Sequence, residues 1–513
     1  MNNTVDNYWV KKYTQFATVL YFTFMIGLLG AGRAFARMHI DLGSTPIYIT
    51  EIVLAILCPL LIFHFKKLMA LPKYFLIITY LFFVYGCVHM AVALGLGNFK
   101  ALRDVVYCGY MLFLPITYLI CIEGDNLKNM LKTFILGGTL SFIWGRCFIG
   151  GCFDHAQFGA EELGFTFGKV PAFNLGISYG LAVCVLFTFI HIFTKKSDKI
   201  ASFILLSGFL YLLAVLGTRT LLLSVFFSLL FIFFFYRLRF VVSLLQLLPF
   251  FAVIAAVFSY YDFFTMQSEH SKIVKAKSEV TMVILNNAIS DLNARFSIGN
   301  HKKEEILMAS SQNNVSSISQ NVPLQDEEPS LEESSLSNFV ERYDEKRKSL
   351  SGLNREIYDS QWWRIRIWQE ALVFAGKSPF LGRGFGIYPD YRVWTYQKNP
   401  SYPDTVKEGD RVLPVHNHLI TIYYKEGLIG LFLFLGFNVY VFLYGMSHIK
   451  KTKDLFIKNS LIASLAMLIY WHVTALLFDV LDLPSTNVLL WVVMGLILVA
   501  GGLSQKIESK TIT

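Results

Sequence analysis

The sequence predicts an all-α protein that crosses a membrane many times. Of its 513 residues, 55% are hydrophobic and only 16% are charged, and the mean hydropathy is +0.51. Soluble domains average about 45–50% apolar and about 25% charged residues. The apolar residues also gather in runs of the roughly 20 residues that a helix needs to cross a bilayer. Backbone groups in lipid must be hydrogen-bonded within the segment, so these runs predict helices.

The apolar runs predict about twelve transmembrane helices with both termini in the cytoplasm. Lysine and arginine are concentrated in every second connection between the runs, and cytoplasmic loops are the ones that carry this excess. Examples are Lys66 and Lys67, then Lys128 and Lys132, then Arg237 and Arg239. The predicted spans lie at 14–32, 46–64, 74–96, 104–122, 130–150, 172–194, 201–217, 220–236, 240–260, 416–446, 458–478 and 484–503.

One connection is far longer than the others and falls on the extracytoplasmic side. It divides the chain into residues 1–260 with the first nine helices, a large loop over 261–415, and residues 416–513 with helices ten to twelve. Within the loop, 308–338 is rich in Ser, Asn, Gln and Glu and has few large apolar residues, so we predict that it is disordered. Aromatic residues at a helical spacing over 356–400 predict a segment that folds back onto the membrane.

Charge and cysteine content exclude some classes of function. The net charge of +9 is distributed over membrane loops and does not indicate nucleic-acid binding. The seven cysteines show neither a C-x-x-C pair nor the spacing of a metal site. Cys147 and Cys152 lie near the outer end of one predicted helix, and the sequence leaves open whether they pair. We predict no metal and no cofactor.

Arg219 is the first candidate for chemistry. It lies in a very short outer connection between two apolar helices, in the sequence Leu-Gly-Thr-Arg-Thr-Leu. Its planar guanidinium suits a phosphate because two N–H groups can bind it at once. The alternative is an interfacial arginine that extends to lipid headgroups.

Two further groups of residues lie at the end of the large loop. Arg364 and Trp368 are four residues apart, on one face of a predicted helix that also carries Arg366. The alternative is an amphipathic helix anchored on the membrane surface by its aromatic residues. Gly382, Gly384 and Gly386 follow and predict a turn with a close backbone approach.

The tenth span opens with His416, Asn417 and His418. A histidine at the outer end of a helix titrates near neutral pH and can act as a base. Eleven residues separate His416 from Gly427, so a continuous helix would place both on nearly the same face. The alternative for both histidines is a structural role at the interface. Arg103, near the outer end of another helix, is a weaker candidate for a supporting role.

Together, these elements resemble the O-antigen ligase and O-antigen polymerase family of bacterial envelope enzymes. The resemblance rests on Arg219 in its hairpin, on the Arg364–Trp368 helix with its glycine turn, and on His416–Asn417 with Gly427. It covers roughly 200–440 by motif. It implies a GT-C-like helical fold in the bacterial inner membrane, with a reaction site on the periplasmic face. The insert at 308–338 and the second arginine, Arg366, depart from the pattern.

The resemblance also implies a chemistry. The family uses a polyprenyl-pyrophosphate-linked glycan as donor and needs no metal. Arg219 and Arg364 would bind the donor pyrophosphate, and Arg366 is the alternative to Arg364 in this role. His416 would be the catalytic base. Asn417, His418, Gly427 and Arg103 would support the site.

The acceptor stays open between two cases. A sugar of the lipid-A core would make the protein a ligase, and the next lipid-linked repeat would make it a polymerase. Alternatives of other classes are a polysaccharide transporter or flippase, which would predict internal repeats, and a non-catalytic membrane scaffold.

Deleting residues 308–338 should leave the protein folded, because so polar a segment buries little apolar surface. The yield of monodisperse protein in detergent, and its melting temperature, should match the full chain. Loss of folded protein would contradict the predicted disorder.

Overall fold

A computed structural model of the chain describes most of its helical part. The described residues are 2–36, 38–42, 45–98, 100–123, 125–149, 159–160, 165–166, 182, 185–190, 199–216, 219–265, 364–365, 367–387, 415–478, 480–481 and 483–512. The chain divides into two compact units. The first combines Met1–Phe263 with Trp368–Thr513, and the second is Phe264–Ile367. Almost all of the second unit, including the insert at 308–338, lies outside the described residues.

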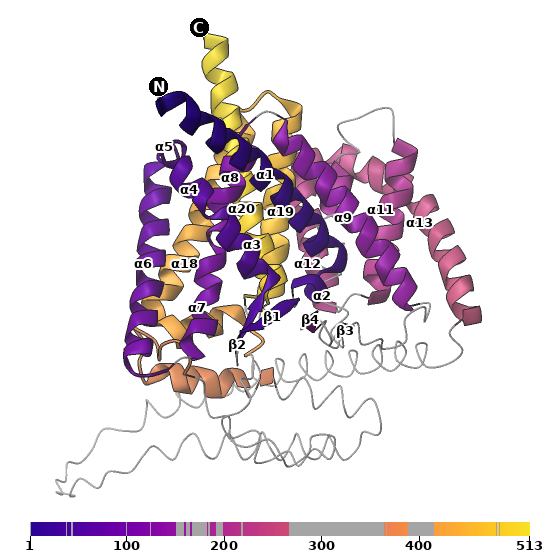
Figure 1. Cartoon of the computed structure of the whole chain (residues 1–513). Coiled ribbons are helices and arrows are strands. Elements are labelled where there is room, and N and C mark those ends of the chain that lie inside the picture. Colours follow the sequence, from indigo (N-terminus) through magenta and orange to yellow (C-terminus); the bar gives the residue numbers. More distant parts are fainter. Residues whose placement is uncertain are drawn as a thin grey trace, which may run out of the picture. The chain divides into compact units, whose positions relative to one another are not determined.

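The first unit is a bundle of helices (Figure 1). Its long helices are α1 (Asn2–Ala31), α6 (Lys73–Gly95), α9 (Asn126–Ile149), α11 (Lys199–Leu216), α12 (Arg219–Tyr236), α13 (Leu238–Thr265), α18 (His418–Lys451), α19 (Leu455–Ala475) and α20 (Pro484–Ile512). Its shorter ones are α2 (Arg33–Ala36), α3 (Ile49–Leu57), α4 (Pro59–Phe63), α5 (Phe65–Leu68), α7 (Lys100–Tyr110) and α8 (Phe113–Cys121).

Five of the described helices are long and apolar enough to cross a membrane. They are Tyr8–Ala31, Lys73–Gly95, His418–Lys451, Leu455–Ala475 and Pro484–Ser509. Shorter apolar helices lie within Ile49–Phe63, Cys108–Cys121, Ser202–Tyr211, Thr220–Tyr236 and Leu238–Ile254. An all-α membrane protein is therefore confirmed. Helices occupy most of the described parts of the predicted spans, but β2 occupies the start of 46–64 and α18 begins at His418, two residues after the start of 416–446. The total of twelve crossings stays a prediction, and most of 172–194 lies outside the described residues.

A small antiparallel sheet, which was not predicted from the sequence, accompanies the helices. Its strands are β1 (His39–Leu42), β2 (Thr45–Tyr48), β3 (Gly159–Ala160) and β4 (Phe165–Thr166), in the order β2-β1-β4-β3. The hairpin of β1 and β2 pairs Leu42 with Thr45 and His39 with Tyr48. A Gly-Ser pair between two four-residue strands is typical of a tight hairpin. Strands this short carry no apolar run of their own, and the predicted span 46–64 wrongly assigned Pro46–Tyr48 of β2 to a helix.

Helix α20 is the most buried of the candidate spans and packs against α19 and α8. Its Trp491 and the Trp471 of α19 are both almost fully buried. Each indole N–H has a partner: Trp491 donates to Asn487 Oδ1 at 2.6 Å, and Trp471 donates to the Thr486 carbonyl at 3.1 Å. Buried polar groups need such partners. The centre of the bundle is therefore fixed by directed hydrogen bonds as well as by apolar packing.

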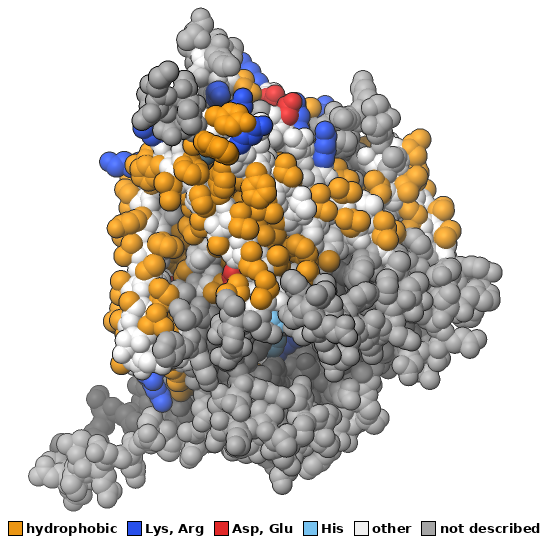
Figure 2. All heavy atoms as spheres, in the orientation of Figure 1, with side chains coloured by type: hydrophobic (Ala, Val, Ile, Leu, Met, Phe, Trp, Pro, Cys, Tyr) orange, Lys and Arg blue, Asp and Glu red, His pale blue; other side chains and the backbone are white. Residues whose placement is uncertain are grey.

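Both termini lie at the same end of this bundle (Figure 1). Lysine and arginine side chains gather at that end, above a band of exposed hydrophobic side chains (Figure 2). Lys67 forms an exposed ion pair with Glu123 there, and Lys128 forms one with Asp125 at 2.8 Å. The sheet and the helix over 367–376 lie at the opposite end (Figure 1). This separation matches a basic face on one side of a membrane, and the cytoplasmic position of that face stays a prediction.

Reporter fusions test the orientation directly. A phosphatase that is active only in the periplasm should be active when fused after Lys272 and inactive when fused after Lys453. A reporter that is active only in the cytoplasm should give the reverse. If both positions report the same compartment, the topology is wrong.

Candidate active site

His416, Asn417 and His418 lie at the start of α18 and are called the histidine element below. Asn417 is the N-cap of the helix, because its side-chain oxygen accepts from the Ile420 N–H at 3.2 Å. Its amide nitrogen donates to the Leu476 carbonyl, at the end of α19, at 2.9 Å. His416, just before the cap, has a φ of +55°, a left-handed conformation that is uncommon outside glycine. Asn417 therefore fixes both the helix start and the residue that precedes it.

His418 has a different environment from His416. Its side chain is fully buried, with its ring 5.0 Å from that of Phe434 and 5.2 Å from that of Trp471, centroid to centroid. Neither ring nitrogen has a hydrogen-bond partner among the described residues. This aromatic packing supports the structural role considered for His418. His416 is half-buried instead of enclosed.

The expected continuous helix from His416 to Gly427 is wrong. Helix α18 begins at His418, and Gly427 interrupts it with φ +68° and ψ −168°. His416 and Gly427 therefore do not lie on one face of a continuous helix. Gly427 instead forms a kink in α18. A φ in this range is adopted almost exclusively by glycine.

The glycine-containing loop over 379–386 replaces the helix hydrogen bonds lost at this kink. In a regular helix the N–H groups of Leu428 and Ile429 would donate to the carbonyls of Tyr424 and Lys425. Here those two N–H groups donate to the loop carbonyls of Pro379 and Phe380, at 2.8 and 3.2 Å. The two carbonyls accept instead from the loop N–H groups of Arg383 and Gly384, at 2.7 and 2.9 Å. Loop and broken helix thus satisfy each other's backbone groups.

This exchange requires glycine at two facing positions. A Cβ on Gly427 would lie 2.2 Å from the Phe380 carbonyl oxygen, and one on Gly382 would lie 2.5 Å from the backbone nitrogens of Glu426 and Gly427. Gly382, Gly384 and Gly386 all have a positive φ, of 72°, 91° and 72°. The predicted turn with a close backbone approach is present, and the backbone that it approaches is that of α18.

A buried ion pair lies against the same loop. Lys425 Nζ is 3.2 Å from Asp104 Oδ1, and the two side chains are only 2% and 7% exposed. The other carboxylate oxygen, Oδ2, accepts from the Gly386 N–H at 2.7 Å. Asp104 therefore joins α7, α18 and the end of the loop. Removing one partner of a buried pair is strongly destabilising, because it leaves the other charge buried.

Glu426 follows Lys425 and is also fully buried. Neither carboxylate oxygen has a hydrogen-bond partner among the described residues. The side chain fits against Gly430, whose Cβ, if present, would lie 2.3 Å from the Cβ of Glu426. Tyr85, on α6, donates to the Glu426 carbonyl at 2.7 Å. The kink therefore places one further ionisable side chain inside the bundle beside a tyrosine.

The helix over 367–376 is tied to the histidine element by Trp368. Its indole N–H donates to the carbonyl of Val415, the residue before His416, at 2.7 Å. Together with the Asn417 cap, this bond fixes the backbone on both sides of His416. Arg364 is four residues before Trp368 in the sequence and is itself helical. Arg366 lies outside the described residues.

Arg219 begins α12, and its side chain lies outside the part of the chain that the structure describes. Ser224, five residues later, accepts from the Thr474 hydroxyl at 2.9 Å, near the end of α19. The Leu476 carbonyl at that same end accepts from Asn417. Since five helical residues span roughly 7.5 Å, the start of α12 lies at the level of the start of α18. The described contacts do not place the two side chains together.

The remaining predicted features are only partly described. Arg103 lies in α7, one residue before Asp104, and its side chain is outside the described set. So are Cys152 and the side chain of Cys147. Among the described residues, no group of three His, Cys, Asp or Glu side chains is placed to hold a metal ion. Metal independence itself stays a prediction.

Comparison with known proteins bears on this region directly. Residues 200–435 match the family model described as O-antigen ligase. This segment is an O-antigen ligase domain. It contains α11 to α13, the helix over 367–376, the glycine loop and the first half of α18, so it includes the kink and the histidine element. No curated protein matches the chain.

The match over this segment confirms the resemblance to the O-antigen ligase family and, together with the long apolar helices, indicates a multi-pass bacterial membrane enzyme of the ligase or polymerase type. Sequence reasoning missed Asp104, Lys425 and Glu426, although all three lie in predicted spans. Ionisable groups at membrane depth are expensive and are functional candidates by default. That signal was present. Which of these charges pair could not be predicted, because Asp104 and Lys425 lie 321 residues apart.

Breaking the buried pair should cost far more stability than breaking an exposed one. Lys425→Met or Asp104→Asn should each lower the free energy of unfolding by about 3–5 kcal/mol. Lys67→Met, which removes an exposed pair, should cost about 0–1 kcal/mol. Reversible unfolding in mixed micelles would measure these differences.

The double variant Asp104→Asn/Lys425→Met keeps an oxygen for the Gly386 N–H and leaves no buried charge at either position. It should recover most of the loss. Additive losses in the double variant would show that the two side chains are not coupled.

Proposed function

We propose that the protein transfers a glycan from polyprenyl pyrophosphate to a sugar hydroxyl on the periplasmic face of the bacterial inner membrane. The observation that carries the proposal is the O-antigen ligase match over 200–435, which spans the kinked α18 and the histidine element. The arrangement suits a reaction that needs a base and anion-binding groups at the mouth of a helical bundle. Both termini then lie in the cytoplasm.

His416 is the proposed catalytic base. An attacking sugar hydroxyl must lose its proton as the new glycosidic bond forms, and a neutral imidazole can accept it. Support comes from the two bonds that immobilise its flanking residues, at Val415 and Asn417. A base held in one position contributes more than a mobile one, because less motion must be lost to reach the reacting geometry.

Arg219 and Arg364 are the proposed ligands of the donor pyrophosphate. The leaving group gains negative charge as the glycosyl bond breaks, and guanidinium groups stabilise that charge with paired hydrogen bonds. Arg366 is the alternative to Arg364 as the second pyrophosphate-binding arginine. Support comes from the position of Arg219 at the start of α12. Arg364 precedes Trp368, the residue that anchors Val415, by four residues in the sequence.

The supporting residues act through geometry. Asn417 holds the start of α18, His418 fills the aromatic pocket beneath it, and Gly427 allows the kink that the glycine loop closes. Arg103 precedes the buried Asp104 and is a candidate for further contact with the donor. We propose no metal or cofactor for the reaction.

Ligase and polymerase differ only in the acceptor, and a deletion strain separates them. If the lipid-A core carries no polymer while lipid-linked polymer accumulates, the protein is a ligase. If the core carries a single repeat, it is a polymerase. A strain in which lipid-linked repeats stay on the cytoplasmic face would indicate a flippase and contradict the proposal.

The residue roles are tested by separating catalysis from binding. His416→Ala should lower the transfer rate by about 10²–10⁴-fold, as expected for loss of a general base. It should leave binding of the lipid-linked donor intact. His64→Ala, at the end of the bundle where the termini lie, is the matched control and should keep the activity. A folded His416→Ala protein with normal turnover would refute the assignment.

Arg219→Lys keeps the charge but loses the paired N–H geometry. It should weaken donor binding and abolish most transfer, even where His416 is intact. If donor affinity and turnover both stay at the level of the unmodified protein, Arg219 does not bind the pyrophosphate.

A further inference from the structure

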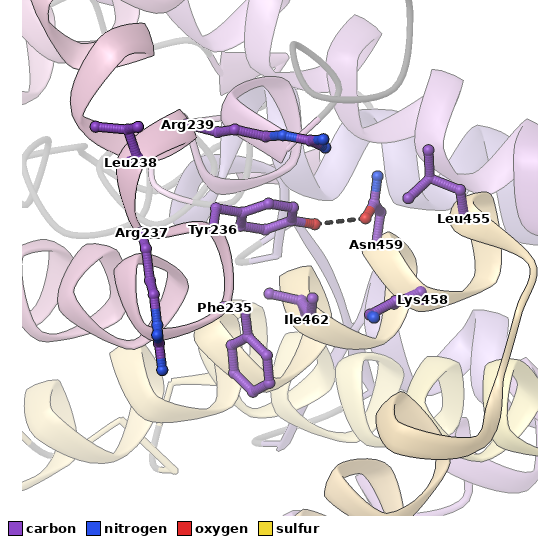
Figure 3. Close-up of a pocket in the computed structure, with 9 residues that line it drawn as sticks. All are labelled: Phe235, Tyr236, Arg237, Leu238, Arg239, Leu455, Lys458, Asn459 and Ile462. Atoms are coloured by element: carbon purple, nitrogen blue, oxygen red, sulfur yellow. Dashed lines mark hydrogen bonds between the residues drawn. The ribbon is translucent and has the colours of Figure 1, made fainter.

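A second polar site lies at the end of the bundle where both termini lie, opposite the histidine element. It is a pocket of about 450 Å³ between the turn that joins α12 to α13 and the first two turns of α19. Figure 3 shows its lining residues. They are Phe235, Tyr236, Arg237, Leu238, Arg239, Leu455, Lys458, Asn459 and Ile462. Nothing in the proposed transfer reaction uses this site.

The pocket is strongly basic. Arg237, Arg239 and Lys458 line it, and no acidic side chain does. In Figure 3, Arg239 extends above the Tyr236 ring toward Asn459. The nearest carboxylate in sequence, Asp454, is occupied as the N-cap of α19, where it accepts from the Ile457 N–H at 2.9 Å. The residues that line the pocket therefore include three cationic side chains and no carboxylate to neutralise them.

A buried donor also faces this site. The Asn459 side chain belongs to a residue only 3% exposed, and its oxygen accepts from the Tyr236 hydroxyl. Its amide nitrogen then has no hydrogen-bond partner among the described residues. In Figure 3 that nitrogen is turned toward the Arg239 side. A buried unsatisfied N–H beside two cations calls for an acceptor that carries negative charge.

The outer wall of the pocket is apolar. Leu238 is 76% exposed and Leu455 is 50% exposed, and both line the pocket next to the basic side chains. The pocket therefore has apolar and basic side chains next to each other, on the turn between α12 and α13 and at the start of α19. A soluble anion would leave these leucines uncovered. An amphiphile with an acyl chain beside a charged head would cover both surfaces.

We propose that this pocket binds the phosphate of an anionic lipid headgroup. Arg239 and Lys458 neutralise the phosphate, Asn459 Nδ2 donates to one of its oxygens, and the acyl chain lies along Leu238 and Leu455. Basic pockets between transmembrane helices bind such headgroups for this reason. Because the pocket joins the α12–α13 turn to α19, a bound lipid would hold these helices together.

Native mass spectrometry of the delipidated full-length protein tests the proposal. Phosphatidylglycerol should bind in preference to phosphatidylcholine of the same chain length. Arg239→Gln/Lys458→Gln should weaken its binding roughly 10- to 30-fold, since each basic side chain contributes about fivefold. Asn459→Asp keeps the acceptor for Tyr236 but repels phosphate, and should weaken binding at least as much. Lys450→Gln/Lys451→Gln, an equal charge change at exposed positions of α18, is the control and should bind normally.

Three outcomes would overturn the proposal. Equal binding of phosphatidylcholine would show a site for lipid in general. Displacement by millimolar inorganic phosphate would show a site for a soluble anion. Equal weakening in the Lys450/Lys451 control would show attraction to the whole basic face. The melting temperature without lipid, measured for each variant, separates loss of the site from loss of the fold.

Discussion

The exchange of backbone hydrogen bonds between the kinked α18 and the glycine loop is the interaction on which the site depends. A helix broken inside a membrane leaves carbonyl and N–H groups that lipid cannot satisfy. Here the loop over 379–386 supplies two acceptors and two donors to α18, so the break exposes none of these four groups. The same exchange fixes the loop against the helix that carries the histidine element, at the end of the bundle opposite the termini.

Buried charge reinforces this arrangement. The Lys425–Asp104 pair links α18 to α7, and the second oxygen of Asp104 holds Gly386 at the end of the loop. An ion pair so deeply buried gains little net stability over apolar packing, but it penalises any arrangement in which the partners separate. It therefore favours one register of loop against helix. Trp368 extends the same framework to Val415, and through it to the residue that we propose as the base.

The helical class, the positions of the five long apolar helices and the glycine turn could be predicted from the sequence, because each of them follows from a local pattern. A long apolar run predicts a membrane helix without knowledge of its neighbours. Three glycines within five residues predict a close approach of another backbone segment, although they do not say which one. The same reasoning failed at Gly427, where a continuous helix was assumed. The hydrogen bonds that compensate the break come from a loop about 45 residues upstream, and no local pattern reports them.

The pairing of Asp104 with Lys425 was out of reach for the same reason, and so was the short sheet at 39–48. The roles of Arg219, Arg364 and His416 rest on the family and on chemistry. The described contacts bring the starts of α12 and α18 to one level of the bundle.

The most direct test of the central claim is an experimental structure of the protein with a non-cleavable polyprenyl-pyrophosphate analogue. We expect the pyrophosphate to lie between the starts of α12 and α18. The Arg219 guanidinium should be about 3–4 Å from a phosphate oxygen, and the His416 ring should face the position of the anomeric carbon. Arg219 and His416 more than about 20 Å apart, with no cavity between them, would contradict a shared site.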